Sequence, residues 1–161
     1  MADPPVGGPG SNRSSAWLAE QLATKQLERQ RPDPKFQKFL LHRVGRSLHF
    51  IDKAPASDPD SEFTLAYDAI RHCIDVHLNV NGLRVMNVAG AHRLYVAYAR
   101  ACMAEIISED DLRLYATFRP IRNASEYPAP GDELQIPADA ARTAFEVAKR
   151  FFKAATDAAR S

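Results

Sequence analysis

Residues 137–158 read PADAARTAFEVAKRFFKAATDA. The apolar side chains of this stretch recur at steps of three and four residues, at Ala141, Ala144, Phe145, Ala148, Phe151, Phe152 and Ala155. That spacing places them on one face of an α-helix, because about 3.6 residues complete a turn. We therefore expect an amphipathic helix over these residues, with its apolar face buried in a core.

The segments at the start of the chain show the same periodicity, and residues that commonly cap helices open them. Ser14 or Ser15 can cap a first helix that reaches about Gln30. Asp33 with Pro34 after it is a favoured start for a second helix. The apolar stripe of the second helix is expected to comprise Phe36, Leu40, Val44, Ser47, Leu48 and Ile51.

The middle of the chain divides in the same way. A third helix is expected to follow Asp58 or Asp60 and to end near the Asn-Gly pair at residues 81–82, which is typical of helix ends. A fourth helix is expected from about His92. Ser108 has three acidic residues behind it, which suits the positive end of a fifth helix.

Pro120 falls inside the pattern of the fifth helix, where it either kinks that helix or opens a new one. Strand signals are weak, because no alternating run of Val, Ile or Thr lies between turn residues. The sequence therefore predicts an all-α, up-and-down bundle of five or six helices over residues 14–161. Residues 1–13 are proline, glycine and polar residues for the most part, and we expect them to form a disordered tail.

Composition narrows the class of protein. The 161 residues are 45% apolar, enough for one sizeable core, and the formal net charge is +1. That balance gives no global attraction to nucleic acid or to an anionic membrane, so any basic surface must be local. No apolar run approaches the length of a membrane span, and no signal pattern opens the chain, so we expect a cytoplasmic protein without a membrane partner.

Cys73 and Cys102 lie in apolar, periodic segments and are expected to be buried thiols, with a disulfide as the alternative.

The most informative stretch for function is FRPIRNASEY at residues 118–127. Together with DAIR at 68–71 and GAHR at 90–93, it resembles the HEPN superfamily, and in particular the bacterial branch with an Arg-Asn-x-x-Glu-Tyr motif near its fifth helix. The resemblance runs in order from about Ser61 to Ala155, through an Asn-Gly-Leu-Arg connector and an alanine-rich last helix. It implies an HEPN-like helical bundle.

The resemblance also implies RNA chemistry. Many HEPN proteins are metal-independent endoribonucleases of toxin, defence or stress type, in which an Arg is followed a few residues later by a His. Two copies of this motif meet in one cleft of a homodimer. Arg122 and Asn123 match the family's Arg and Asn, whereas Tyr127 stands where the His would be. An arginine fork can hold a phosphodiester, but a tyrosine with a pKa of about 10 is a poor general base, so the resemblance implies binding more strongly than cleavage.

The candidate site follows from this carry-over. Arg122, Asn123 and Tyr127 are the candidates for catalysis. The candidates for substrate binding are Arg119, Glu126 and His92. In the branch that is paired with nucleotidyltransferase antitoxins, a tyrosine near this motif can accept nucleotidyl groups, so RNA, a second copy of the chain and an antitoxin of that type are the expected partners.

The neighbouring helices could extend this site. Arg119 and Arg122 are three residues apart and share a helix face. With Arg71 and Arg93, they could form a basic groove that binds a phosphate backbone. The five histidines are scattered, and no pair of them has a carboxylate or cysteine beside it at metal-ligand spacing, so we expect neither a metal nor a cofactor.

Each candidate residue also has a structural explanation. Arg122 and Glu126 are four residues apart and could form a surface ion pair. Tyr127 could cover one end of the bundle, and His92 could cap or border a helix start. The alternative function is therefore a non-catalytic helical module for dimerisation or protein interaction. The tyrosine in place of histidine, the near-neutral charge and Pro120 favour it.

Overall fold

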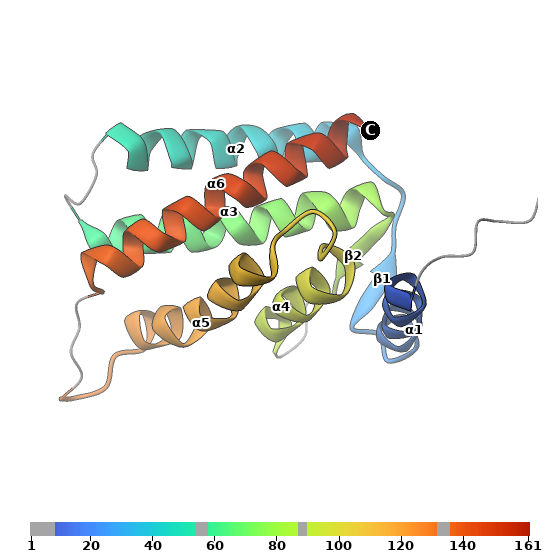
Figure 1. Cartoon of the computed structure of the whole chain (residues 1–161), viewed down its shortest axis with the longest axis horizontal. Helices are drawn as coiled ribbons and strands as arrows, with labels where there is room; N and C mark the ends of the chain where they lie inside the picture. Colours follow the sequence, from blue (N-terminus) through green and yellow to red (C-terminus); the bar gives the residue numbers. More distant parts are fainter. Residues whose placement is uncertain (1–8, 54–57, 87–89, 132–135) are drawn as a thin grey trace, which may run out of the picture.

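The computed structural model describes residues 9–53, 58–86, 90–131 and 136–161, and these residues form six helices and one short two-stranded sheet (Figure 1). In chain order the elements are α1 Pro9–Ala23, β1 Leu27–Arg29, α2 Pro34–Lys53, α3 Pro59–Val80, β2 Leu83–Val85, α4 Ala91–Cys102, α5 Glu109–Glu126 and α6 Ala138–Arg160. The predicted all-α bundle is confirmed. Among the described residues, no helix is both long enough and apolar enough to cross a bilayer.

The core lies where α3 and α6 run against each other, with α2 across both of them. In Figure 1, α2, α6 and α3 run alongside one another in the upper half, and α5 and α4 lie below. The predicted stripe of α6 is buried from Ala141 to Ala155, with Phe152 half-buried at its edge. The small alanines let α6 approach α3 closely while the phenylalanines fill the space between helices.

Side-chain caps fix where the helices begin. The Asp33 carboxylate accepts hydrogen bonds from the backbone N–H groups of Lys35 (3.0 Å) and Phe36 (3.2 Å), so the predicted start of α2 is confirmed. Asp58, rather than Asp60, caps α3. Ser108 caps α5 as predicted.

The N-terminal region differs from the prediction. α1 begins at Pro9, so residues 9–13, which we assigned to a disordered tail, are helical, and residues 1–8 lie outside the described part of the chain. α1 also ends at Ala23 instead of near Gln30, and Lys25 has a φ of 57°. The chain then pairs Leu27 with Val85 in the antiparallel β1–β2 sheet, which buries Leu27 in the core. Strands of three residues are too short to show alternation, which is why the sequence did not reveal them.

One predicted core residue lies on the outside. Phe36 was expected in the apolar stripe of α2, but its side chain is 40% exposed. Gln37 is buried in its place, because its amide nitrogen donates to Asn79 Oδ1 at 2.8 Å. Asn79 Oδ1 also accepts from the Asp33 backbone N–H at 2.8 Å. A buried polar residue with partners can therefore turn a phenylalanine toward solvent.

Two questions that the sequence left open are now settled. α5 is one helix from Glu109 to Glu126 with Pro120 inside it, so no new helix begins there. Proline has no backbone N–H to donate to the carbonyl one turn earlier in the helix. Because Pro120 is exposed, water can hydrate that carbonyl instead. Cys73 and Cys102 are both free thiols, the first buried and the second half-buried.

Candidate functional site

The candidate site lies where α5 crosses α3. The rings of Phe63 and Phe118 meet edge to face with centroids 5.7 Å apart, and those of Tyr67 and Tyr115 are 5.9 Å apart. Tyr67 comes after Phe63 on α3, whereas its partner Tyr115 comes before Phe118 on α5. The two helices are therefore antiparallel. This crossing determines which polar side chains can meet.

Arg71 and Arg119 approach the same point from opposite directions. Arg71 lies one turn after Tyr67 on α3, and Arg119 lies one turn after Tyr115 on α5. Helical side chains lean toward the N-terminus of their own helix. Because α3 and α5 are antiparallel, both guanidinium groups lean back toward the tyrosine pair.

The electrostatics of Tyr67 show the same convergence. Burial raises the pKa of the Tyr67 hydroxyl, and the positive charges of Arg119, Arg71 and Arg122, in decreasing order, oppose that rise. The positive charges of all three guanidinium groups thus act on this hydroxyl. We call Arg71, Arg119 and Arg122 the arginine cluster. The predicted grouping of Arg71 with Arg119 and Arg122 agrees with this shared electrostatic effect on Tyr67 and stays a prediction.

Two arginines of the cluster, Arg71 and Arg119, each have a guanidinium nitrogen without a hydrogen-bond acceptor in the described part of the chain. The Nε atoms of Arg71 and Arg119 are buried without a hydrogen-bond partner in the described part of the chain. Arg71 Nη2 is 3.9 Å from Asp68 Oδ1, a long contact between two partly exposed side chains. A buried donor without an acceptor costs about 1–3 kcal/mol. Natural proteins keep few such groups, and each calls for a reason such as a functional role.

An acid with a shifted pKa lies beside the cluster. Tyr95 on α4 donates a hydrogen bond to Asp75 Oδ1 at 2.7 Å. Burial raises the pKa of Asp75 to about 6, against the opposing effects of that hydrogen bond and of Arg71, which lies one turn before it on α3. Asp75, Tyr67 and Tyr95 were not among the site residues predicted from the sequence. The available signal was a lone carboxylate between Ile74 and Val76 in an otherwise apolar part of α3.

Apart from Arg119 and Arg122, the predicted site residues are exposed, or their side chains lie outside the described part of the structure. Arg122 is half-buried, whereas Asn123 is exposed. Tyr127 follows the last residue of α5 and is 75% exposed. The side chain of Glu126 lies outside the described part of the structure. His92 is exposed in the first turn of α4, and within the described residues its side chain makes no hydrogen bond or ion pair.

Arg93 belongs to a different surface from the one we expected. It lies on the side of α4 that faces α1, roughly opposite Tyr95 on the helix. There it lines a groove of about 980 Å³ together with Arg13, Arg29, Arg100 and Trp17. The proposed basic groove of four arginines is therefore divided, with Arg71 on one side of α4 and Arg93 on the other.

Within the described ranges, no group of three or more His, Cys, Asp or Glu side chains could hold a metal ion. The site is thus composed of arginines, tyrosines and two carboxylic acids, the buried Asp75 and the more exposed Asp68. Its chemistry is suited to holding an anion, and Asp75 adds a group that can exchange a proton near neutral pH. Comparisons with protein-family models, with curated proteins and with solved structures gave no match to this chain.

Proposed function

We propose that this chain binds RNA, and that the arginine cluster holds the phosphate backbone. The observation that carries the proposal is that the Nε atoms of Arg71 on α3 and Arg119 on α5 are buried without a hydrogen-bond partner in the described part of the chain, while both charges act on the same buried tyrosine, Tyr67. Planar guanidinium forks match the geometry of phosphate oxygens and can bind them through paired hydrogen bonds. The resemblance of residues 118–127 to HEPN proteins supports RNA as the anion.

The same resemblance supports a homodimer, in which two copies of the Arg122-Asn123 motif share one cleft. A pair of clusters would contact more phosphates than one, and each phosphate neutralised adds to the salt dependence of binding. A toxin, defence or stress role, with a nucleotidyltransferase-type antitoxin as partner, belongs to the same proposal and rests on the resemblance alone.

Cleavage of the bound RNA would need a group that moves a proton to or from the reacting oxygens. Tyr127 is a poor choice because its side chain is 75% exposed, so no buried environment holds it against a substrate. Asp75 is better suited, since its pKa is raised to about 6 and it lies one turn from Arg71. Metal-free cleavage is therefore the second part of the proposal, with Asp75 as the candidate acid–base group.

Binding is tested by fluorescence anisotropy with a labelled single-stranded RNA of about 20 nucleotides. The variants Arg71→Gln and Arg119→Gln are each expected to weaken binding about tenfold or more, because each removes a charge-assisted hydrogen bond. Each should also lower the dependence of the binding constant on salt by about one phosphate contact.

The matched control removes charges from the α1–α4 groove. Arg93→Gln and Arg100→Gln make the same change in net charge on exposed side chains outside the cluster. If the control and cluster variants lose affinity equally, binding is a diffuse charge effect and the cluster is not the site. If all variants bind as the wild type does, the arginine cluster does not bind RNA.

Cleavage is tested with total RNA in the presence of a chelator. The wild type is expected to cleave, and Asp75→Asn and Arg122→Ala are expected to abolish cleavage. Light scattering on the same samples gives the solution mass and tests the dimer. Binding without cleavage in the wild type would remove the nuclease part of the proposal and leave the binding part intact.

A further inference from the structure

The outer face of α2 carries phenylalanines and basic residues in one line. Starting from Phe36, steps of three and four residues give the set that we call the α2 stripe: Phe36, Phe39, Arg43, Arg46, Phe50 and Lys53. The phenylalanine side chains are 40%, 60% and 60% exposed, in chain order, and the basic members are exposed as well. Because the spacing is that of a helix face, the six side chains form one continuous ridge.

The helix is strongly basic. Along its 20 residues α2 has five Lys and Arg side chains and a single acid, Asp52. Lys35 and Lys38 flank the stripe near its start, and both are exposed. The whole chain has a net charge of only +1, so this helix concentrates positive charge on one surface. Its field attracts anions, and charge complementarity therefore requires an anionic partner.

A second copy of the chain does not fit this surface. If two α2 stripes packed together in antiparallel fashion, Arg43 of one copy would lie opposite Arg46 of the other. In a parallel arrangement each arginine would face its own equivalent. Both arrangements gather four guanidinium groups at the centre of the contact, and like charges brought together in an interface cost several kcal/mol.

An apolar hollow lies beside the ridge. It measures about 990 Å³, and its wall includes Leu65 of α3 and Phe152 of α6, with Phe50, Arg46 and Lys53 of α2 around it. Apolar walls with basic side chains at the edge suit a molecule that has both an anionic head and a hydrocarbon tail. A phosphate backbone lacks the hydrocarbon part, and a bilayer of anionic lipids has both.

The shape of the surface also favours a flat partner. The stripe spans 18 residues from Phe36 to Lys53, which is about 26 Å along a helix. α2 forms one edge of the molecule, with α6 and α3 on its inner side (Figure 1). A convex ridge can lie along a planar bilayer over its whole length. Sequence-tolerant binding of single-stranded nucleic acid uses grooves with stacking platforms instead.

We propose that the α2 stripe docks the protein on the surface of an anionic lipid bilayer. α2 would lie in the plane of the interface, with Phe39 and Phe50 inserted among the lipid chains and with Arg43 and Arg46 at the level of the headgroups. Phe36 and Lys53 would extend the contact at the two ends. This is an interfacial association and involves no membrane-spanning segment.

The proposal does not depend on the RNA-binding function. The arginine cluster lies on α3 and α5, whereas the stripe lies on the solvent side of α2, and α3 and α6 lie between α2 and α5 (Figure 1). Loss of one activity by substitution on its own surface would therefore leave the other measurable.

The test is sedimentation of the purified full chain with large vesicles. One set consists of phosphatidylcholine alone, and the other contains about one third phosphatidylglycerol. Binding is expected only to the anionic set at 150 mM salt and should be lost at 500 mM salt, because salt screens exposed charges. Each basic residue near an anionic surface contributes roughly fivefold to binding, so Arg43→Gln with Arg46→Gln should weaken it about thirtyfold.

The phenylalanines are tested separately. Phe39→Ala with Phe50→Ala removes apolar area without altering charge, and it should weaken vesicle binding about tenfold or more. Both side chains are largely exposed, so these variants are expected to keep the wild-type melting temperature. Matched controls elsewhere on the surface are Ile106→Ala, an exposed apolar residue, and Arg93→Gln with Arg100→Gln.

Three outcomes would overturn the proposal. Equal sedimentation with neutral and anionic vesicles would exclude charge as the basis of docking. Vesicle binding by folded stripe variants at the wild-type level would remove α2 as the surface. Absence of vesicle binding by the wild type, together with loss of RNA affinity in the stripe variants, would assign the stripe to nucleic acid instead.

Discussion

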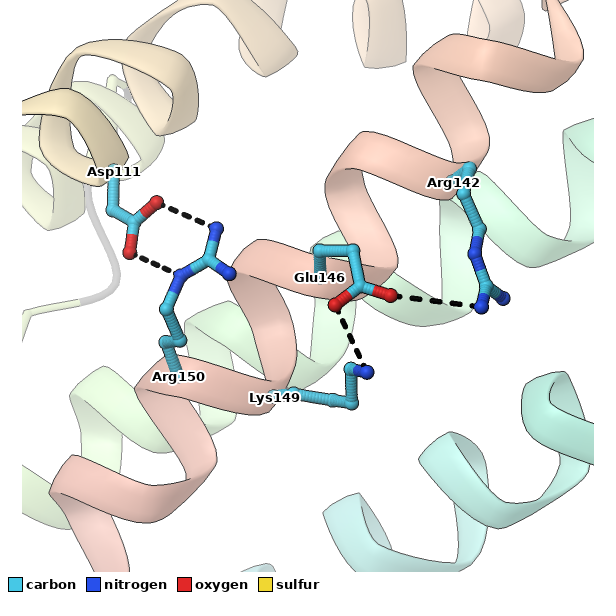
Figure 2. Close-up of polar contacts among 5 residues, drawn as sticks. All are labelled: Asp111, Arg142, Glu146, Lys149 and Arg150. Atoms are coloured by element: carbon cyan, nitrogen blue, oxygen red, sulfur yellow. Dashed lines mark hydrogen bonds and ion pairs between the residues drawn. The ribbon is translucent and has the colours of Figure 1, made fainter.

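The contact between Asp111 and Arg150 joins the first turn of α5 to α6 (Figure 2). Arg150 Nε donates to Asp111 Oδ2 at 2.5 Å, and Arg150 Nη2 donates to Asp111 Oδ1 at 2.8 Å. The side chain of Asp111 is only 6% exposed, whereas that of Arg150 is 52% exposed. Replacing Arg150 by alanine would therefore leave a buried carboxylate without its cation.

The cost follows from that asymmetry. Removing one partner of a fully buried ion pair costs about 3–5 kcal/mol. Since half of the Arg150 side chain is in water, we expect a smaller loss of about 2–3 kcal/mol in the free energy of unfolding for Arg150→Ala. The positive end of α5 continues to stabilise Asp111 in the variant, which also limits the loss. For a chain of this size the melting temperature should fall by about 4–12 °C.

Urea unfolding followed by circular dichroism measures this loss, and Arg142→Ala is the matched control. Arg142 on the same helix makes one ion pair, 3.6 Å from Glu146, in which both side chains are well exposed (Figure 2). Its guanidinium also lies over the Phe145 ring, 4.9 Å from the ring centroid. Such a surface pair contributes less than about 0.5 kcal/mol. If Arg150→Ala cost no more than Arg142→Ala, the argument from burial and paired hydrogen bonds would be refuted.

Three further results are expected. Folded Asp75 holds its proton up to about pH 6, while the unfolded chain releases it near 3.8, so the folded state binds more protons between these two pH values. The free energy of unfolding should therefore fall by about 2–3 kcal/mol as the pH rises from 3.8 to about 6. Urea titrations at several pH values measure this fall, and it should be absent in Asp75→Asn. Asn79→Ala deprives Gln37 and the Asp33 backbone of their shared acceptor and should cost about 2–3 kcal/mol in chemical denaturation, whereas a loss under 0.5 kcal/mol would mean that water replaces the amide. Gly82→Ala should lower the melting temperature through about 1–2 kcal/mol of strain, because Gly82 has a φ of 71° and an added Cβ would lie 3.2 Å from a backbone oxygen; an unchanged melting temperature would contradict this.

The sequence predicted the helices of the bundle best where caps and periodicity agreed. Asp33 and Ser108 marked helix starts that the structure confirms, and the alanine-rich stripe of α6 is buried as expected. Prediction failed where tertiary contacts decided the outcome. Leu27 lies in a strand and not in the predicted helix, because it pairs with β2. Gln37 is buried where Phe36 was expected, because Gln37 bonds to Asn79, which is distant in the sequence. Local patterns carry no information about such partners.

Some features of the candidate site could likewise be predicted from the sequence, and others depended on tertiary contacts. Arg119 and Arg122 were predictable as neighbours because helical spacing fixes which residues share a face. The position of Arg71 beside them depends on how α3 and α5 cross, and that of Arg93 on the rotation of α4, neither of which periodicity specifies. Asp75 became visible only through the three-dimensional burial that raises its pKa.

The net charge of the chain says little about either proposed surface. At physiological salt the field of an exposed charge fades over about 8 Å, which is less than the diameter of one helix. α3 and α6 lie between α2 and α5 (Figure 1), so the arginine cluster and the α2 stripe should act as electrostatically independent surfaces. Arg119→Gln should then weaken RNA binding without changing vesicle binding, and Arg43→Gln with Arg46→Gln should do the reverse. If either variant weakened both activities equally, a single diffuse field would explain binding better than two separate surfaces.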